Sequence, residues 1–329
     1  MGSIAAYIYC RPQQPSLRVN LDTFSSEECK ELLRFRKEDI PLVIGALGMP
    51  EVMRCSNGTT FLSIEGFMIL AYSMAFPNRL IEMKQLFHRS EDDLSRIFNY
   101  LLMWIRERWI HLLRGRNICV TTTAAKYYNE ILKEKTQMDP FPVFAFIDGT
   151  LRPCARPSVF QYSIYNGMDR VHGLKYLIVL TPDGMMPLLS GPHEGAHHDS
   201  WCFKNSFIET VLENRIGREF TLYGDQGFAN CSLLLTAYRG AHLNSMQSDW
   251  NRRVNACRTS VERGIGKVCT LWTHMNLKEQ QKLLLRRVGP MYEVAVLLTN
   301  VHTTLYGSET AQYFNCEPPQ LLQYISNNY

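Results

Sequence analysis

The stretch FAFIDGTLRP, residues 144–153, decides how the second half of the chain is interpreted. Residues 143–147 form a short apolar run, rich in aromatic and β-branched side chains, which is typical of a buried strand. The run ends on Asp148, which Gly149 follows. An Asp-Gly pair often makes a turn, because aspartate bonds its own backbone and glycine tolerates positive φ. The alternative is a strand that rigidly mounts a catalytic carboxylate, and the rest of the chain must decide between the two.

The composition indicates a folded protein that works inside the cell. The chain has 329 residues, of which 46% are hydrophobic, so one large domain or two moderate ones can form a sizeable core. The net charge of +4 is compatible with nucleic acid but too small to argue for it. The beginning of the chain lacks the basic region of a secretory signal, and no apolar stretch approaches a membrane span of about 20 residues. The ten cysteines contain no C-x-x-C pair, which favours reduced thiols.

The first part of the chain, residues 1–137, is predicted to be all helical. Apolar residues recur at helical spacing over 63–76, 80–87 and 90–110. A helix, a short turn and a longer helix between residues 64 and 110 would suit a helix-turn-helix that reads DNA. They would equally suit a three-helix bundle. The two prolines within residues 138–142 then predict a linker.

The second part has a different character, and residues 138–310 are predicted to form a mixed α/β domain followed by a C-terminal tail over 311–329. Its expected elements alternate between strands and helices, which favours a layered α/β fold. The strands are expected at 143–147, 160–165, 174–180, 186–189 and 220–223, and the helices at 200–213 and 249–270.

Three acidic residues stand out by their positions. Asp148 ends one expected strand, Asp225 ends another within GDQGF, and Glu262 lies inside an expected helix. Each also has a simple structural explanation: the aspartates could make turns, and the glutamate could pair with Arg258 one helical turn earlier. Two strand-end carboxylates and one helix carboxylate are, however, what two-metal phosphoryl transfer needs. Mg²⁺ prefers hard oxygen ligands, and two such ions about 4 Å apart can activate a nucleophile and stabilise a leaving oxygen.

Segments spread from about residue 144 to 324 carry a family resemblance: IDGTLRP, YNGMDRVHGLKY, TPDG, GPHEGAHHDS, GDQGF, RTSVERGIGKV, MYEVAVLLTNVHTTLYG and YFNCEPPQLLQYI. In these segments the chain resembles the PIF/Harbinger transposase family. That resemblance implies an RNase H-like fold, with a mixed sheet flanked by helices and a triad of two aspartates and a glutamate (DDE). It implies that Asp148, Asp225 and Glu262 are the catalytic residues and metal ligands.

The family resemblance also implies a function. Such enzymes cut double-stranded DNA at transposon ends and join the freed 3′-hydroxyls to target DNA, using two Mg²⁺ or Mn²⁺ ions. A separate Myb-like protein would supply sequence-specific DNA binding and nuclear import, so we expect this chain in the nucleus and the cytoplasm. Several copies could assemble on DNA. The alternative is a domesticated transposase-derived factor that binds DNA or protein and no longer transposes.

Further residues are candidates for the metal site or for the scissile phosphate. Asp199 could be a fourth acid near the metals, or the N-cap of the helix expected to start near residue 200. His172 and Lys175 could contact the scissile phosphate, although a structural role on a strand is the alternative.

Other basic residues are candidates for DNA contact, with a solvated protein surface as the alternative. Arg89 and Arg96 flank the turn and first helical turns of the expected helix-turn-helix, and would contact phosphates while Ser95 and Asn99 face base edges. The remaining candidates lie on the helix that carries Glu262, and they are Arg252, Arg253, Arg258 and Lys267.

Overall fold

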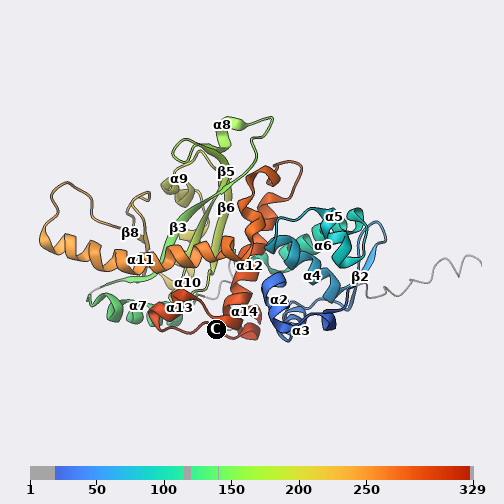
Figure 1. Cartoon of the computed structure of the whole chain (residues 1–329). Helices are drawn as coiled ribbons and strands as arrows, with labels where there is room; N and C mark the ends of the chain where they lie inside the picture. Colours follow the sequence, from blue (N-terminus) through green and yellow to red (C-terminus); the bar gives the residue numbers. More distant parts are fainter. Residues whose placement is uncertain (1–18, 115–119, 140, 327–329) are drawn as a thin grey trace, which may run out of the picture. The chain divides into compact units, whose positions relative to one another are not determined.

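The computed structural model describes residues 19–114, 120–139 and 141–326, which fold as two compact units (Figure 1). The first unit runs to Ser73 and includes Asn78–Leu101, and the second comprises Met74–Pro77 and the chain from Leu102 onward. The sequence placed the boundary at residue 137. In the structure helix α7 (Thr122–Thr136) belongs to the second unit, because it packs against strand β3.

The first unit is mainly helical, but it is not all-α as expected. Strands β1 (Val52–Arg54) and β2 (Thr60–Leu62) pair antiparallel. Asn57 and Gly58 lie in the turn between them, and Gly58 has a φ of 94°. An Asn-Gly pair between apolar residues is a strong hairpin signal, so this hairpin could have been predicted. The helical elements are η1 (Leu21–Thr23), α2 (Ser26–Leu33), α3 (Asp39–Ala46), most of α4 (Ser63–Ala75), α5 (Leu80–Phe87) and the start of α6 (Glu91–Trp109).

The expected helix, turn and longer helix are present as α5, residues 88–90 and α6, but Arg89 does not have the expected role. Its side chain is buried, and its Nε and Nη2 donate to the two carboxylate oxygens of Glu65 at 2.6 and 2.7 Å. Nη2 also donates to the backbone carbonyl of Thr60 at 3.1 Å. The prediction that Arg89 contacts DNA phosphate is therefore wrong, because its guanidinium is already engaged in the protein interior. Arg96 is exposed, 3.9 Å from Asp92, and remains a candidate.

A six-stranded mixed sheet forms the centre of the second unit. Strand β3 (Val143–Pro153) runs antiparallel to β5 (Val171–Leu180) on one side and parallel to β7 (Thr221–Gly224) on the other. Beyond β5 lie β6 (Leu188–Glu194) and the short β4 (Tyr165–Asn166), and beyond β7 lies the parallel β8 (Leu234–Thr236). The mixed α/β prediction is confirmed, with a curled mixed sheet flanked by helices.

Two expected elements are different in the structure. The strand expected at 160–165 is mostly helix α8 (Gln161–Ile164), with only β4 extended. The helix expected at 200–213 is divided into α9 (Asp199–Lys204) and α10 (Ile208–Ile216). Ser206 lies at the division, where its hydroxyl donates to the carbonyl of Phe203 and accepts from the amide of Ile208. Such local side-chain bonds compete with helix continuation.

Long helices cover the sheet in the C-terminal half. The helix expected at 249–270 is confirmed as α11 (Ser245–Leu271), which contacts both β3 and β5 (Figure 1). The segment predicted as a C-terminal tail, residues 311–329, packs against the rest of the second unit where it is described. Phe314 stacks on Phe146, and Tyr324 is buried. The remaining elements are η2 (Ile110–Leu112), η3 (Thr273–Asn276), η4 (Lys278–Gln280), α12 (Val288–Tyr306), α13 (Glu309–Phe314) and α14 (Leu321–Ser326). Among the described residues, no helix has the length and apolar character needed to cross a bilayer.

We predict that the buried Arg89–Glu65 pair is essential for the stability of the first unit. Arg89→Ala should lower the free energy of unfolding by about 3–5 kcal/mol, because it leaves the Glu65 carboxylate buried without a partner. Arg96→Ala is the matched control and should change it by less than about 0.5 kcal/mol, since its ion pair is exposed. Urea denaturation measures both variants. Equal, small effects would contradict the buried-pair interpretation.

Candidate active site

Strand β3 does not end at Asp148, as the sequence suggested, but continues through it. Asp148 and Gly149 pair with Ile178 and Leu177 of β5, so the Asp-Gly pair makes no turn. The parallel pairing with β7, however, ends one residue earlier, where Ile147 faces Gly224. Strand β3 therefore loses its neighbour on that side at Asp148. Its side chain is partly exposed there, while the preceding residues 143–147 are buried.

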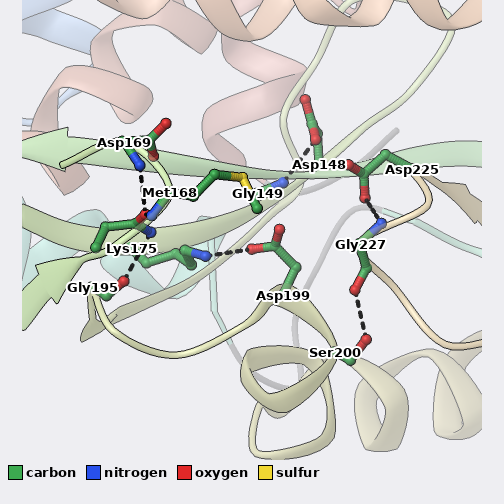
Figure 2. A network of polar contacts seen from close by, with 11 residues as sticks. Asp148, Gly149, Met168, Asp169, Lys175, Gly195, Asp199, Ser200, Asp225 and Gly227 are labelled. Atoms are coloured by element: carbon green, nitrogen blue, oxygen red, sulfur yellow. Dashed lines mark hydrogen bonds and ion pairs between the residues drawn. The ribbon is translucent and has the colours of Figure 1, made fainter. Parts of the chain in front are cut away.

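Asp225 lies beside Asp148 because of the same pairing. It directly follows Gly224, the last residue of β7, which is in register with Ile147. The Asp225 Oδ1 accepts a hydrogen bond from the amide of Gly227 at 2.8 Å, which fixes the carboxylate at the strand end (Figure 2). Two neighbouring strands thus present their carboxylates at the same edge of the sheet.

Glu262 reaches the site from helix α11. It lines a cleft of about 440 Å³ together with Asp225 and Arg258. Its carboxylate is half-exposed and accepts a hydrogen bond from the Arg258 guanidinium one helical turn earlier. The pairing of Glu262 with Arg258 considered from the sequence is therefore present, and it lies within the cleft that also contains Asp225.

The charges of the three acids interact with one another through Asp148. The pKa of Asp148 is raised to about 6, mainly by burial and in smaller part by the negative charges of Asp225 and Glu262. The positive charge of Arg258 and the hydrogen bond from the Gly149 amide act in the opposite direction on this pKa. A carboxyl group whose pKa is raised by burial and by neighbouring carboxylates is common at functional sites.

The chemistry of these donors fits a hard divalent cation, which prefers carboxylate oxygens. As the side chains lie, no group of three or more His, Cys, Asp or Glu residues within the described part of the chain encloses a position for a metal ion. Glu262 is turned toward Arg258, so a three-carboxylate site would require this side chain to change its partner.

Asp199 is a fourth carboxylate at the same place. It is the first residue of α9, whose N-cap is His198, and no side chain caps the helix, so the N-cap interpretation of Asp199 is wrong. Its side chain points instead toward the backbone that follows the two strand-end acids (Figure 2). A Cβ atom on Gly149 would lie 2.4 Å from its Oδ1, and one on Gly227 would lie 3.1 Å from its Oδ2.

Lys175 compensates the charge of Asp199 from strand β5. Its buried Nζ lies 3.1 Å from the Asp199 Oδ1, although this oxygen accepts no hydrogen bond of good geometry. The contact is therefore an ion pair rather than a hydrogen bond. Sequence reasoning missed the two glycines that make room for this carboxylate, although each stands one or two residues after a candidate acid.

Among the remaining basic candidates, Lys267 is turned away from the cleft. Its Nζ donates to the Thr303 hydroxyl at 3.0 Å and to the Gly307 carbonyl at 2.7 Å, at the C-terminal end of α12. Burial lowers its pKa to about 8. The prediction that Lys267 lines a DNA groove is wrong, because its ammonium joins two helices instead.

The other candidates remain near the surface. Arg252 and Arg253 both pair with Asp249, and Arg253 also donates to the carbonyls of Thr136 and Gln137. The ring of His172 packs against Tyr165, with centroids 5.1 Å apart. Of the predicted basic residues, Arg258 and Lys175 are thus the two whose charges act on the candidate acids.

We predict that Gly149→Ala destabilises the protein through a clash with Asp199. The added methyl group would lie far inside contact distance of the carboxylate, and overpacking of this kind costs about 1–3 kcal/mol. Adding Asp199→Ala should remove the clash and recover much of the loss. Chemical denaturation of the single and double variants forms the test. Fully additive losses would show that the two residues do not contact.

We predict that Asp148→Asn stabilises the metal-free protein in a pH-dependent way. A carboxyl whose pKa is raised on folding lowers stability as the pH rises from about 4 through 6, because the folded state must lose a proton that it binds well. Asn carries no charge, so in EDTA at pH 8 the variant should be more stable by on the order of 1–3 kcal/mol. This advantage should vanish at pH 4. A pH-independent difference would contradict the assignment, and Asp139→Asn, an exposed acid paired with Lys133, is the control.

Comparison with known proteins relates the segment that carries these acids to a family of endonucleases. Residues 147–300 match the family described as DDE superfamily endonuclease, and this segment contains Asp148, Asp225, Glu262 and Asp199. No significant match exists among the curated proteins or the solved structures. Endonucleases of this superfamily generally act on DNA with divalent metals. The match therefore supports the DDE superfamily for this part of the chain, and with it a nuclease- or transposase-type function.

Proposed function

We propose that the protein is a metal-dependent DNA endonuclease of the Harbinger transposase type, with an RNase H-like nuclease domain. The observation that carries the proposal is the coincidence of two independent features. The segment that matches the DDE endonuclease family contains Asp148, Asp225 and Glu262, and the charges of these same residues interact in the structure. The Harbinger type is favoured by the sequence resemblance over residues 144–324.

Asp148, Asp225 and Glu262 would hold two Mg²⁺ or Mn²⁺ ions through their carboxylate oxygens. When bound, such ions activate the attacking oxygen and stabilise the leaving oxygen of a phosphodiester. Asp199 is a candidate for a further oxygen donor, because its carboxylate lies against the residues next to the two aspartates. Asp148 must lose its proton before it binds a cation, and its pKa of about 6 makes that loss easy at neutral pH.

Two basic side chains, Arg258 and Lys175, hold the acids of the metal-free site in place. Arg258 donates to Glu262 and acts on Asp148 and Asp225 through its charge, while Lys175 pairs with Asp199. If Glu262 held a metal ion, Arg258 would lose this partner within the cleft. Its guanidinium would then be available for a phosphate oxygen of the DNA strand, for which it is well suited.

The biological reaction proposed is cleavage of double-stranded DNA at transposon ends, followed by joining of the 3′-hydroxyl to target DNA. A Myb-like partner would supply sequence recognition and bring the chain into the nucleus, and copies of the chain could assemble on DNA. Arg96, Ser95 and Asn99 on α6 remain candidates for DNA contact. Within the nuclease domain, Arg252 is a candidate for DNA contact, since its side chain is exposed on α11.

We predict that Asp225→Asn abolishes Mg²⁺-dependent DNA nicking. The substitution keeps the size of the side chain but removes the charge needed to hold the cation. DNA affinity measured in EDTA should stay the same or rise slightly, because one negative charge near the phosphate is lost.

Nicking of supercoiled DNA in Mg²⁺ or Mn²⁺ is the measurement, with Asp139→Asn as the control, since that aspartate lies outside the site and pairs with Lys133. Undiminished metal-dependent nicking by Asp225→Asn would reject the proposed site. Loss of DNA binding together with nicking would mean that the substitution disturbs the fold rather than the chemistry.

A further inference from the structure

The segment between β3 and β5 displays large apolar side chains to solvent. Residues 159–168, named here the aromatic loop, include Phe160 and Tyr162, whose side chains are 70% and 81% exposed. Met168 at the far end of the loop is 86% exposed. Figure 1 shows α8, the helical part of this loop, projecting beyond the sheet at the end of β5. Scattered exposed apolar residues need no explanation, but a group within ten residues does. The other exposed members are Val159 and Tyr165.

The backbone at Phe160 is strained, and its ring is exposed. Phe160 has φ 56° and ψ 33°, the left-handed conformation that bulky residues rarely adopt. Burial does not compensate this strain, because most of the ring lies in solvent. Glycine or asparagine would fit the backbone better, so stability does not explain the phenylalanine. Strained residues that persist without a packing reason are typical of binding sites.

The aromatic loop is held firmly by the segment that leads to Asp199. The amide of Ala196 donates to the Ser163 carbonyl at 3.1 Å, and the Asn166 Nδ2 donates to the Gly195 carbonyl at 3.0 Å. Gly195 itself is packed so closely that a Cβ atom would lie 2.7 Å from the Ile164 carbonyl oxygen. Figure 2 shows Gly195 and the loop residue Met168 near Lys175 and Asp199. The loop is therefore a fixed part of the same scaffold as the candidate active site.

The strand register gives the distance between the loop and the catalytic carboxylates. Asp148 pairs with Ile178 and the loop residue Tyr165 pairs with His172, so six residues along β5 separate Asp148 from the loop. Six residues of strand span about 20 Å. A stacked DNA strand advances about 3.4 Å per nucleotide, so a strand with its phosphate at Asp148 would reach the loop about six nucleotides away.

The charge of the surrounding residues favours a nucleic acid over a protein as the occupant. Within residues 154–172 the only acid is Asp169, whereas Arg156, Arg170 and His172 are basic. Aromatic rings beside arginines bind unpaired bases by stacking, while the cations attract the phosphates.

We propose that the aromatic loop is a stacking platform for unpaired nucleotides of the DNA strand whose phosphate lies at the carboxylates. The orientation of that strand rests on the proposed endonuclease function, but the stacking itself requires no metal and no cleavage. Phe160 and Tyr162 would each contribute a ring face. The ligand class is single-stranded DNA, including the frayed or cut end of a duplex.

The test measures binding of the full chain to a labelled oligothymidylate of about fifteen nucleotides in EDTA, by fluorescence anisotropy. Phe160→Gly combined with Tyr162→Ala should raise the Kd roughly 10-fold or more, since two stacking surfaces for bases are lost. The factor should be the same at every salt concentration, because ring stacking releases no counterions. Affinity for a blunt duplex should change much less, since its bases are already stacked. Phe160→Gly alone should also raise the melting temperature, because it relieves the strained backbone.

Two control variants make the result specific. Tyr162→Phe keeps the ring and should bind like the parent, and Tyr127→Ala removes an exposed tyrosine from α7 and should also bind like the parent. Unchanged affinity in the double variant, or an equal loss in Tyr127→Ala, would overturn the proposal and favour a protein partner for the loop.

The outcome is distinguishable from that of the proposed nuclease function. Ring-dependent binding without any Mg²⁺-dependent cleavage would support the platform and count against the nuclease. If Mg²⁺-dependent cleavage is present but the double variant binds DNA as tightly as the parent, the nuclease function is supported and the stacking platform is rejected.

Discussion

The structure of the second unit depends on one electrostatic constraint, the placing of several carboxylates together in a partly buried space. Burial and like charge raise the pKa of Asp148 to about 6, which measures how unfavourable its ionised form is there. The Arg258 guanidinium on α11 reduces this cost, while Lys175 on β5 pairs with the neighbouring Asp199. The sheet makes the arrangement possible, because its central strand loses a neighbour at Asp148. A cation would complete the charge balance, as divalent ions do in such sites.

Much of this could be predicted from local sequence, because strand and helix periodicity and the strand-end acids are encoded in short segments. The long helix that carries Glu262 and the buried run before Asp148 are examples. The predictions that failed concerned side chains whose direction depends on tertiary contacts. A pattern of residues cannot say that Arg89 faces the buried Glu65, or that Lys267 faces the end of α12 rather than DNA. Both are cations on or beside amphipathic helices, and only the packing of another element decides their direction.

The fine structure of the site was also beyond local reasoning. The Asp-Gly pair at 148–149 is a turn signal in most sequences, and here it is continuous strand because β5 supplies partners for both residues. Asp199 was equally ambiguous, since an aspartate before a helix is a common cap. Its direction is set by the space above Gly149 and Gly227, which are distant from it in sequence. The glycines that follow the two aspartates thus make room for Asp199, the fourth carboxylate.

The contacts of Lys267 have a mechanical consequence for Glu262. Both lie on α11, and the Lys267 ammonium fastens this helix to the end of α12 little more than one turn beyond Glu262. These two hydrogen bonds restrain movement of α11 along its axis close to Glu262. If the proposed metal site forms, exchange of Glu262 between Arg258 and a cation requires only rotation about the side-chain bonds of Glu262. Exposed side chains rotate within picoseconds to nanoseconds, far faster than helices or domains move. Assembly of the proposed site would then be limited by the arrival of the ions and the DNA rather than by movement of α11.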